Sequence, residues 1–152
     1  LDPIRREEFT ASRGRGAQLN GRRVRVTMAN SLEGTLIGTG IPFKSRSEQH
    51  ISAYMKSLEA VARETAGIRR AGSAALDLAY VAAGRLDGFW EIGLSKWDIA
   101  AGILLVREAG GLISDFQGGG HYLESGNIVA ASPKCLKSLL QAVKPQLDHI
   151  RG

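Results

Sequence analysis

The spacing of hydrophobic and polar positions changes several times along the chain, and each change predicts a different element. From Phe9 to Val26, short apolar stretches alternate with polar residues and glycines, and Asn20-Gly21 separates Leu19 from the alternating run at 22–26. Asn-Gly between two alternating runs is a strong signal of a two-residue β-hairpin. We therefore predict that an antiparallel β-ribbon opens the chain.

The rest of the chain alternates between strand-sized and helix-sized patterns. A strand is predicted over 35–39, and a long helix from Ser47 to about Ala66, where apolar residues recur on one face before Gly67. Further strands are predicted over 68–71, 88–92, 112–116 and 127–131, and further helices over 73–83, 96–109 and 133–150. This alternation favours a layered α/β/α domain with a mixed, largely parallel sheet.

Glycine, serine and proline positions indicate where the helices begin and end. Gly84 and Gly110 stand where two helices are expected to end, and Ser132-Pro133 places a capping serine before a proline at a first helical position. Cys135 falls in the apolar pattern of the last helix, which predicts a reduced, packed thiol and not a disulfide or a metal ligand.

Length and composition predict one domain. The chain has 152 residues, 43% of them hydrophobic, which suits a single domain over 1–152 with a real core. No run approaches the roughly 20 apolar residues of a membrane span, and the acid in Leu1 to Arg6 is unlike a signal peptide. We expect a cytoplasmic protein without a membrane partner. The opening residues Leu1 to Arg6 resemble the middle of a structural element, which indicates that the chain is a fragment.

The charge is positive and unevenly placed. The net charge is +5, and seven arginines fall within the first 25 residues, which suits a phosphorylated ligand or a nucleic acid equally well. Arg13-Gly14-Arg15-Gly16 is too short to predict RNA binding by itself, and it lacks the third glycine and the strand–helix unit of a dinucleotide loop.

The segment 89–102 is the densest candidate for chemistry, because it runs from a strand end through a short loop into a helix. Glu91 and Asp98 would flank that loop, and two oxygen ligands there would suit a hard cation such as Mg²⁺. Asp98 has an alternative role as the acid of a capping box with Ser95. Glu91 has an alternative role as a solvated acid at a strand end.

A second candidate is Gly72-Ser73-Ala74-Ala75, which opens a helix whose free N–H groups suit an anion or a hydroxyl. The alternative is an ordinary N-cap followed by alanines that allow close helix packing. The three histidines have no partner spacing, and we find no Ser/His/Asp or Cys/His arrangement for nucleophilic catalysis.

Several of these segments together resemble a known family. Trp97-Asp98-Ile99-Ala100-Ala101-Gly102, followed by Glu108-Ala109-Gly110-Gly111, resembles the second signature of the inositol monophosphatase family, which is long and specific. The segments 2–11, 16–21, 72–77 and 87–91 also match the family in order and spacing. The resemblance covers essentially the whole chain and is closest to the SuhB-type proteins of proteobacteria.

The resemblance implies roles for the candidate residues. Asp98 would be a ligand of a catalytic, lithium-sensitive Mg²⁺ site, Glu91 would hold inositol hydroxyls, and Gly72, Ser73 and Ala74 would line the sugar site. The implied substrate is inositol 1-phosphate or a related sugar phosphate, and the implied assembly is a homodimer. The implied fold is the carboxyl-terminal domain of the sugar phosphatase fold.

The chain also departs from the family. Members carry an earlier Asp-Pro-x-Asp-Gly-Thr signature and a Glu-Glu pair that supply most metal ligands, and this combination is absent here. Asp2-Pro3-Ile4 is followed by Arg5-Arg6 and takes no catalytic role. We therefore expect a carboxyl-terminal half without the amino-terminal catalytic half, with no complete catalytic set and no phosphatase activity of its own.

Two other functions stay open at this point. SuhB-type proteins are also associated with transcription antitermination, where they would bind the transcription machinery, and the positive charge is compatible with that. A sugar-phosphate binding module without hydrolysis is the third possibility.

Overall fold

The computed structural model describes residues 1–42 and 48–150 of the chain, with five helices and eight strands in that part. In chain order they are β1 (Phe9–Ser12), β2 (Gly16–Leu19), β3 (Arg22–Val24), β4 (Leu36–Thr39), α1 (Glu48–Glu64), β5 (Gly67–Arg69), α2 (Ala74–Ala82), β6 (Gly88–Glu91), α3 (Lys96–Glu108), β7 (Leu112–Ser114), α4 (Tyr122–Ser125), β8 (Ile128–Ala131) and α5 (Pro133–Leu147). The predicted start of the first helix, Ser47, lies outside the described residues. The short helix α4 was not predicted.

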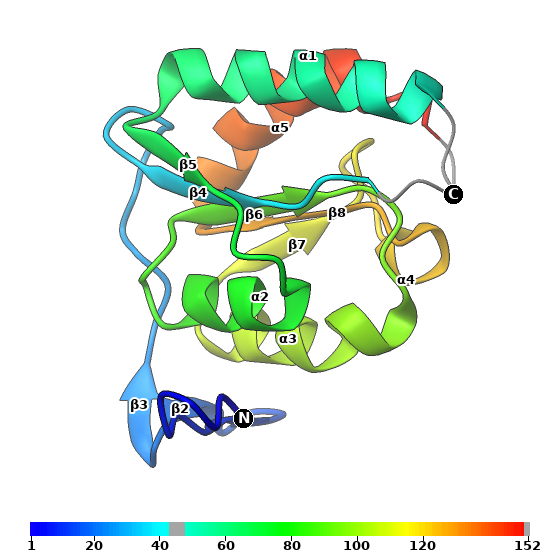
Figure 1. Cartoon of the computed structure of the whole chain (residues 1–152). Helices are drawn as coiled ribbons and strands as arrows, with labels where there is room; N and C mark the ends of the chain where they lie inside the picture. The colour runs from blue at the N-terminus through cyan, green and yellow to red at the C-terminus, as the bar shows by residue number, and fades with distance from the viewer. Residues whose placement is uncertain (43–47, 151–152) are drawn as a thin grey trace.

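The central sheet has the strand order β5-β4-β6-β8-β7. Strand β4 pairs in parallel with β5 and β6, whereas β8 pairs antiparallel with β6 and β7, so four strands share one direction and β8 opposes them. Helices α1 and α5 cover one face of this sheet, and α2 and α3 cover the other (Figure 1). The predicted layered α/β/α domain with a mixed sheet is confirmed.

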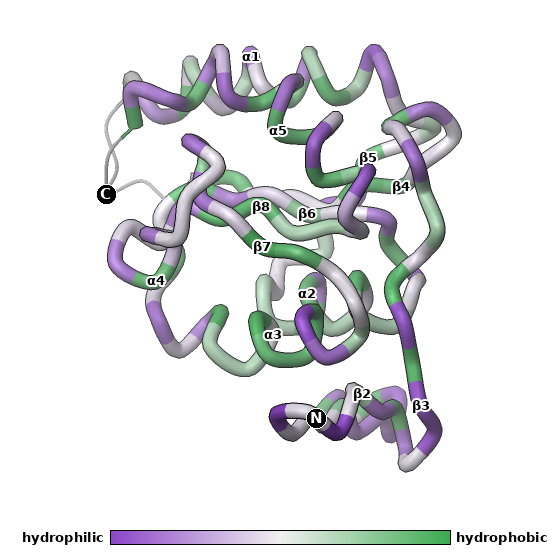
Figure 2. The backbone as a smooth tube through the Cα atoms, turned by 180° about the vertical axis from the view of Figure 1, so that it is seen from behind, coloured by the Kyte–Doolittle hydropathy of each residue, from purple (hydrophilic) through white to green (hydrophobic). Residues whose placement is uncertain are grey.

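The core lies on both faces of the sheet because successive strand residues point to opposite sides. Trp90 and Val129 pack towards α1 and α5, and Phe89 and Ala130 pack towards α2 and α3. Along α1, hydrophobic and hydrophilic positions alternate, whereas α3 and β7 are more continuously hydrophobic (Figure 2). Burial on two faces selects apolar residues throughout a middle strand such as β8, in which all four residues are buried.

The predicted β-ribbon is a separate three-stranded sheet, β1-β2-β3, that packs against α3 (Figure 1). Asn20 and Gly21 both have positive φ, 48° and 76°, as the two central residues of a type I′ turn require. The carboxylate of Glu108, at the end of α3, accepts hydrogen bonds from the amides of Gly14 (2.9 Å) and Gly16 (2.8 Å). The glycines of the Arg13–Gly16 turn thus fasten the ribbon to the helical layer.

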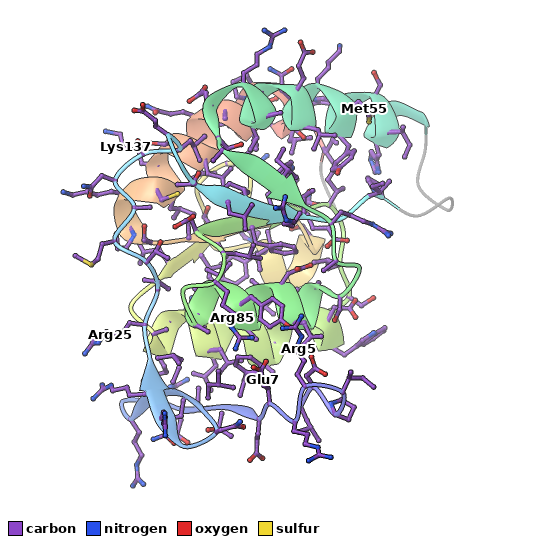
Figure 3. The ribbon with its side chains drawn as sticks, turned by 60° about the vertical axis from the view of Figure 1, so that its left-hand side comes forward. Arg5, Glu7, Arg25, Met55, Arg85 and Lys137 are labelled. Atoms are coloured by element: carbon purple, nitrogen blue, oxygen red, sulfur yellow. The ribbon has the colours of Figure 1, made fainter. Side chains whose placement is uncertain are left out.

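A second tie joins the ribbon to the helices. Arg85, which follows α2, donates to both carboxylate oxygens of Glu7 at 2.7 and 2.6 Å (Figure 3). The same guanidinium lies 5.1 Å from the ring centre of Tyr80 and 6.0 Å from that of Phe9. A planar guanidinium suits both contacts at once, because it forms a bidentate ion pair at its edge and stacks on aromatic rings with its face.

Most predicted helix ends are confirmed, with one correction. Gly84 and Gly110 follow the C-caps of α2 and α3 and have positive φ. Ser132 is the N-cap residue of α5, but its hydroxyl donates to the carbonyl of Ala29 (2.9 Å) instead of capping the helix. Cys135 is a free, buried thiol, as predicted.

None of the helices in the described part of the chain is both long and apolar enough to cross a membrane.

Candidate functional site

The residues predicted to bind metal or substrate lie around one cavity of about 210 Å³. The cavity is bounded by the end of β4, the start of α2, the end of β6 and the start of α3. Its lining includes Gly72, Ser73, Ala74, Glu91 and Asp98, which the sequence places in two segments some 20 residues apart. The α/β topology brings these segments together, because they follow β5 and β6, which both pair in parallel with β4, so the carboxyl ends of the three strands meet at one edge of the sheet.

Asp98 lies in the first turn of α3, where it forms the predicted capping contact and also lines the cavity. Its Oδ2 accepts a hydrogen bond from the amide of Ser95 at 3.0 Å, which is the acidic half of a capping box. The same side chain lines the cavity and is only partly buried. Capping therefore fixes the orientation of the carboxylate while the residue still faces the cavity.

Glu91 ends β6 and is 7% exposed, so the alternative of a solvated strand-end acid is wrong. The parallel neighbour β4 continues into Gly40, which lies directly against the Glu91 side chain. A Cβ at position 40 would come within 2.1 Å of the Glu91 carboxylate, so only glycine leaves this acid its place beside the cavity.

Helix α2 presents its amino-terminal end to the cavity. Gly72 has a φ of 93°, and Ser73 is the N-cap, with its hydroxyl accepting from the amide of Leu76 at 3.4 Å. Ala74 and Ala75 are the first two helical residues, whose amides have no intrahelical acceptor. The ordinary N-cap is thus observed, and Ala74 and Ala75 also line the cavity.

Asn127 was predicted only as the start of a strand, yet it holds the loop that joins β6 to α3. Its Oδ1 accepts from the amide of Gly93 at 2.9 Å, and the neighbouring carbonyl of Gly126 accepts from the amide of Leu94 at 2.8 Å. These two bonds position the segment between Glu91 and Asp98. No sequence signal pointed to this role, because the contact joins residues more than 30 positions apart.

Asp77 is the second residue that the sequence analysis missed. It lies in the first turn of α2, lines the cavity and is 2% exposed. Burial raises the pKa of its carboxyl to about 6, and the nearby Arg70 guanidinium partly opposes that shift. The residue was part of a family-like segment, but a lone acid in a first helical turn carries no signal for burial.

The charges around the cavity favour hydroxyl donors and a cation. Asp77, Glu91 and Asp98 contribute three carboxyl groups, and Arg70 is the cationic side chain in the lining. Within residues 1–42 and 48–150, no three His, Cys, Asp or Glu side chains are grouped closely enough to enclose a metal ion. Asp98 fits a hard cation as one ligand of several, since Mg²⁺ is held by few carboxylates together with waters and phosphate oxygens.

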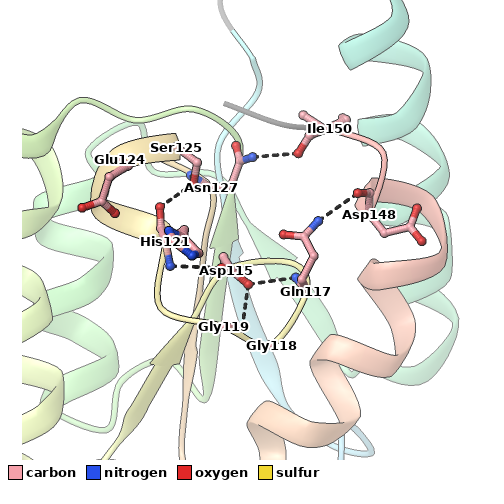
Figure 4. A pocket seen from close by; sticks show the side chains of 10 residues that line it. All are labelled: Asp115, Gln117, Gly118, Gly119, His121, Glu124, Ser125, Asn127, Asp148 and Ile150. Atoms are coloured by element: carbon pink, nitrogen blue, oxygen red, sulfur yellow. Dashed lines mark hydrogen bonds between the residues drawn. The ribbon is translucent and has the colours of Figure 1, made fainter.

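A second, larger cavity of about 630 Å³ lies between the loop after β7, α4 and the end of α5 (Figure 4). Several of its polar groups already have partners within the protein. Asp115 accepts from the amides of Gln117 (2.9 Å), Gly119 (2.7 Å) and His121 (3.0 Å), while Asn127 donates to the carbonyl of Ile150 (3.0 Å). These bonds hold the loop in shape, so we assign this cavity a structural role despite its size.

Comparison with known proteins shows which family has this sequence and fold. Residues 1–148 match the inositol monophosphatase family. The protein "Nus factor SuhB" of Pseudomonas aeruginosa is 60% identical over 147 residues, and that of Escherichia coli K12 is 56% identical over the same length. Both alignments cover 97% of this chain and 54% of the relative, so the chain spans about half the length of the curated relatives it matches.

Solved structures agree with the sequence comparison. The extragenic suppressor protein suhB of Bartonella henselae is 49% identical, with a TM-score of 0.90 over 95% of this chain and 54% of that chain. The inositol monophosphatase of Anabaena is 35% identical, with a TM-score of 0.89 over 95% of this chain and 59% of that chain. With a family match over almost all of its length, the chain belongs to the inositol monophosphatase family.

Proposed function

We propose that the chain is the carboxyl-terminal half of a Mg²⁺-dependent phosphatase that hydrolyses inositol 1-phosphate, or a related sugar phosphate, to the free polyol and phosphate. One observation carries the proposal: Glu91, Asp98 and the start of α2 line the same cavity. The likeness to the Anabaena inositol monophosphatase supports it.

Each cavity residue has a role in this proposal. Asp98 holds one Mg²⁺ ion, with its orientation fixed by the Ser95 amide. When bound, metal ions in such a site lower the pKa of the attacking water and neutralise charge on the phosphate and the leaving oxygen. Glu91 accepts hydrogen bonds from polyol hydroxyls, and the amides at the start of α2, which line the same cavity, donate to the sugar.

The remaining metal ligands must come from outside this chain. Phosphate monoesters hydrolyse so slowly unaided that the site has to lower the barrier by many kcal/mol, which takes several fixed ligands. The relatives are about twice as long as the chain, which leaves room for an amino-terminal half that carries those ligands. We therefore expect the 152 residues alone to be inactive, with a lithium-sensitive homodimer as the active form of the longer protein.

The test is Mg²⁺-dependent phosphate release from inositol 1-phosphate by the longer protein. Asp98→Asn is expected to lower kcat by at least about one hundred-fold, because an amide is a poor ligand for a hard cation. Asp148→Asn, an exposed acid at the end of α5, is the matched control and should leave the rate unchanged. Multiple turnovers by the isolated chain, or full activity of Asp98→Asn, would contradict the proposal.

The names of the relatives favour a second function, that of a partner of the transcription machinery. All seven arginines of the first 25 residues are exposed. Binding through this surface should weaken steeply with salt and tolerate Asp98→Asn, since arginine contacts to an anionic partner release counterions. An inactive wild-type protein that shows such binding would place this function first.

A further inference from the structure

The loop between β6 and α3 donates three consecutive backbone amides. The amide of Gly93 donates to Oδ1 of Asn127 (2.9 Å), and that of Leu94 donates to the carbonyl of the residue before Asn127 (2.8 Å). The next amide, that of Ser95, donates to Oδ2 of Asp98 (3.0 Å). Any displacement of the first two amides therefore moves the third, which orients the Asp98 carboxylate.

The side chain of Asn127 is 2% exposed and uses both ends of its amide. While Oδ1 accepts from Gly93, Nδ2 donates to the carbonyl of Ile150 at 3.0 Å, in the segment that follows α5 (Figure 4). A planar amide supplies an acceptor and a donor within one short group. Aspartate would place an oxygen against the Ile150 carbonyl, and leucine would leave both partners unpaired, so this position requires an amide.

The acceptor in the segment after α5 is itself held by packing. Ile150 is 3% exposed, and its side chain belongs to the same core cluster as Leu139 of α5. Its amide donates to the carbonyl of Leu147, the last residue of α5, at 3.0 Å. Because a packed core leaves side chains little freedom, the Ile150 carbonyl has a fixed position from which Asn127 is held.

Two other contacts tie the end of α5 to the loop after β7. Gln117 donates from its side chain to the carbonyl of Asp148 (2.8 Å), and Lys144 donates to the carbonyl of Gln117 (3.3 Å). Gln117 does not line the cavity around Asp98. Within residues 1–42 and 48–150, Asn127 is thus the side chain that bonds both to the segment after α5 and to the loop before α3.

We propose that Asn127 is a positioning residue that makes the orientation of Asp98 depend on the segment after α5. The inference rests on the proposed function, in which Asp98 is a Mg²⁺ ligand, and it assigns part of the metal affinity to a residue outside the lining of the cavity. Groups that orient a metal ligand from behind change metal affinity about ten- to one hundred-fold when they are removed.

The experiment measures the Mg²⁺ affinity of the longer protein, through the rise of Tm with Mg²⁺ and through phosphate release. Asn127→Leu removes both amide bonds and is expected to raise the half-saturating Mg²⁺ concentration about ten- to one hundred-fold. Ile150→Ala keeps the bond to Gly93 but loosens its anchor, so the expected rise is about three- to ten-fold. The kcat at saturating Mg²⁺ should fall less than about three-fold in both, because Asp98 itself is retained.

Leu139→Ala is the matched control for Ile150→Ala. Both residues are buried in the same cluster, so both truncations lower Tm, but only Ile150 carries the carbonyl that Asn127 holds. Leu139→Ala should change the half-saturating Mg²⁺ concentration less than about two-fold. The double variant Asn127→Leu/Ile150→Ala should bind Mg²⁺ as Asn127→Leu does, because the link is already broken. Equal effects of the two truncations, or additive effects in the double variant, would overturn the proposal.

Hydrogen exchange without Mg²⁺ separates this inference from the phosphatase proposal. The amides of residues 93–95 should exchange faster in Ile150→Ala than in Leu139→Ala, whether or not the protein hydrolyses phosphate esters. If the wild type is inactive but shows this difference together with the Mg²⁺ shift, the phosphatase proposal fails and the Asn127 assignment stands. Equal exchange in the two variants overturns the Asn127 assignment, whatever the activity of the wild type.

Discussion

Gly126 provides a sharp test of how the cavity loop is held. Gly126 caps α4 with a φ of 71°, and a Cβ there would lie 2.0 Å from the carbonyl oxygen of Leu94 and 2.5 Å from its nitrogen. Gly34 has almost the same φ, 73°, with nothing within 4 Å of its Cβ position. The two glycines thus differ in the space around them and share the backbone conformation.

The expected losses of stability follow from the backbone conformation that the two glycines share and from the different space around them. Alanine in the left-handed region costs about 1–2 kcal/mol at either site. Gly126→Ala pays about 1–3 kcal/mol more, because its methyl group collides with backbone atoms that cannot change rotamer. We therefore expect Gly126→Ala to lower the free energy of unfolding by about 2–5 kcal/mol and Gly34→Ala by about 1–2 kcal/mol.

Urea unfolding followed by tryptophan fluorescence measures both losses. Trp90 is fully buried and reports the core, whereas Trp97 is 83% exposed and changes little on unfolding. Equal destabilisation by the two variants, within about 0.5 kcal/mol, would refute the steric reasoning. Because Leu94 lies in the loop between Glu91 and Asp98, Gly126→Ala should also disturb the cavity and Gly34→Ala should not.

Three further predictions concern single ionisable side chains. Asp77 has a pKa of about 6 when folded and 3.8 as a free group, so the folded state binds more protons between these values and the protein loses stability as the pH rises through them. Asp77→Asn should therefore gain stability over the wild type between about pH 4 and about pH 7, by up to about 3 kcal/mol in urea titrations; a constant difference would contradict this. Burial raises the pKa of Cys135 to about 11, so the native thiol should react with Ellman's reagent only as fast as the protein opens, and rapid native labelling would show that the thiol is accessible. Glu108→Gln replaces one of the two oxygens that accept from Gly14 and Gly16, so hydrogen exchange at one of these amides should accelerate, while Glu124→Gln, at an exposed site in α4, serves as the control.

Local patterns determined most of the secondary structure. The Asn20-Gly21 turn, the helices over 74–82 and 96–108 and the final helix from Pro133 all follow from signals within a few residues of each other. Such signals act through backbone conformation and capping, which neighbouring residues decide. The four-residue helix α4 escaped prediction because it is too short to have a hydrophobic period.

Local patterns also identified the candidate residues one at a time. Glu91, Asp98 and the Gly72–Ala74 segment could be chosen from strand-end and helix-start positions and from the family resemblance. The sequence could not decide whether Asp98 caps a helix or faces a cavity, and the structure contains both geometries in one side chain.

Tertiary structure alone decided what surrounds those residues. The burial of Glu91 behind Gly40, the anchoring of its loop by Asn127 and the burial of Asp77 depend on contacts between segments far apart in the chain. Burial and hydrogen-bond satisfaction are properties of the packed fold and not of any sequence window. An acid in a first helical turn has the same local sequence signal whether it is solvated or buried. Asp77 is buried only because the sheet packs against α2.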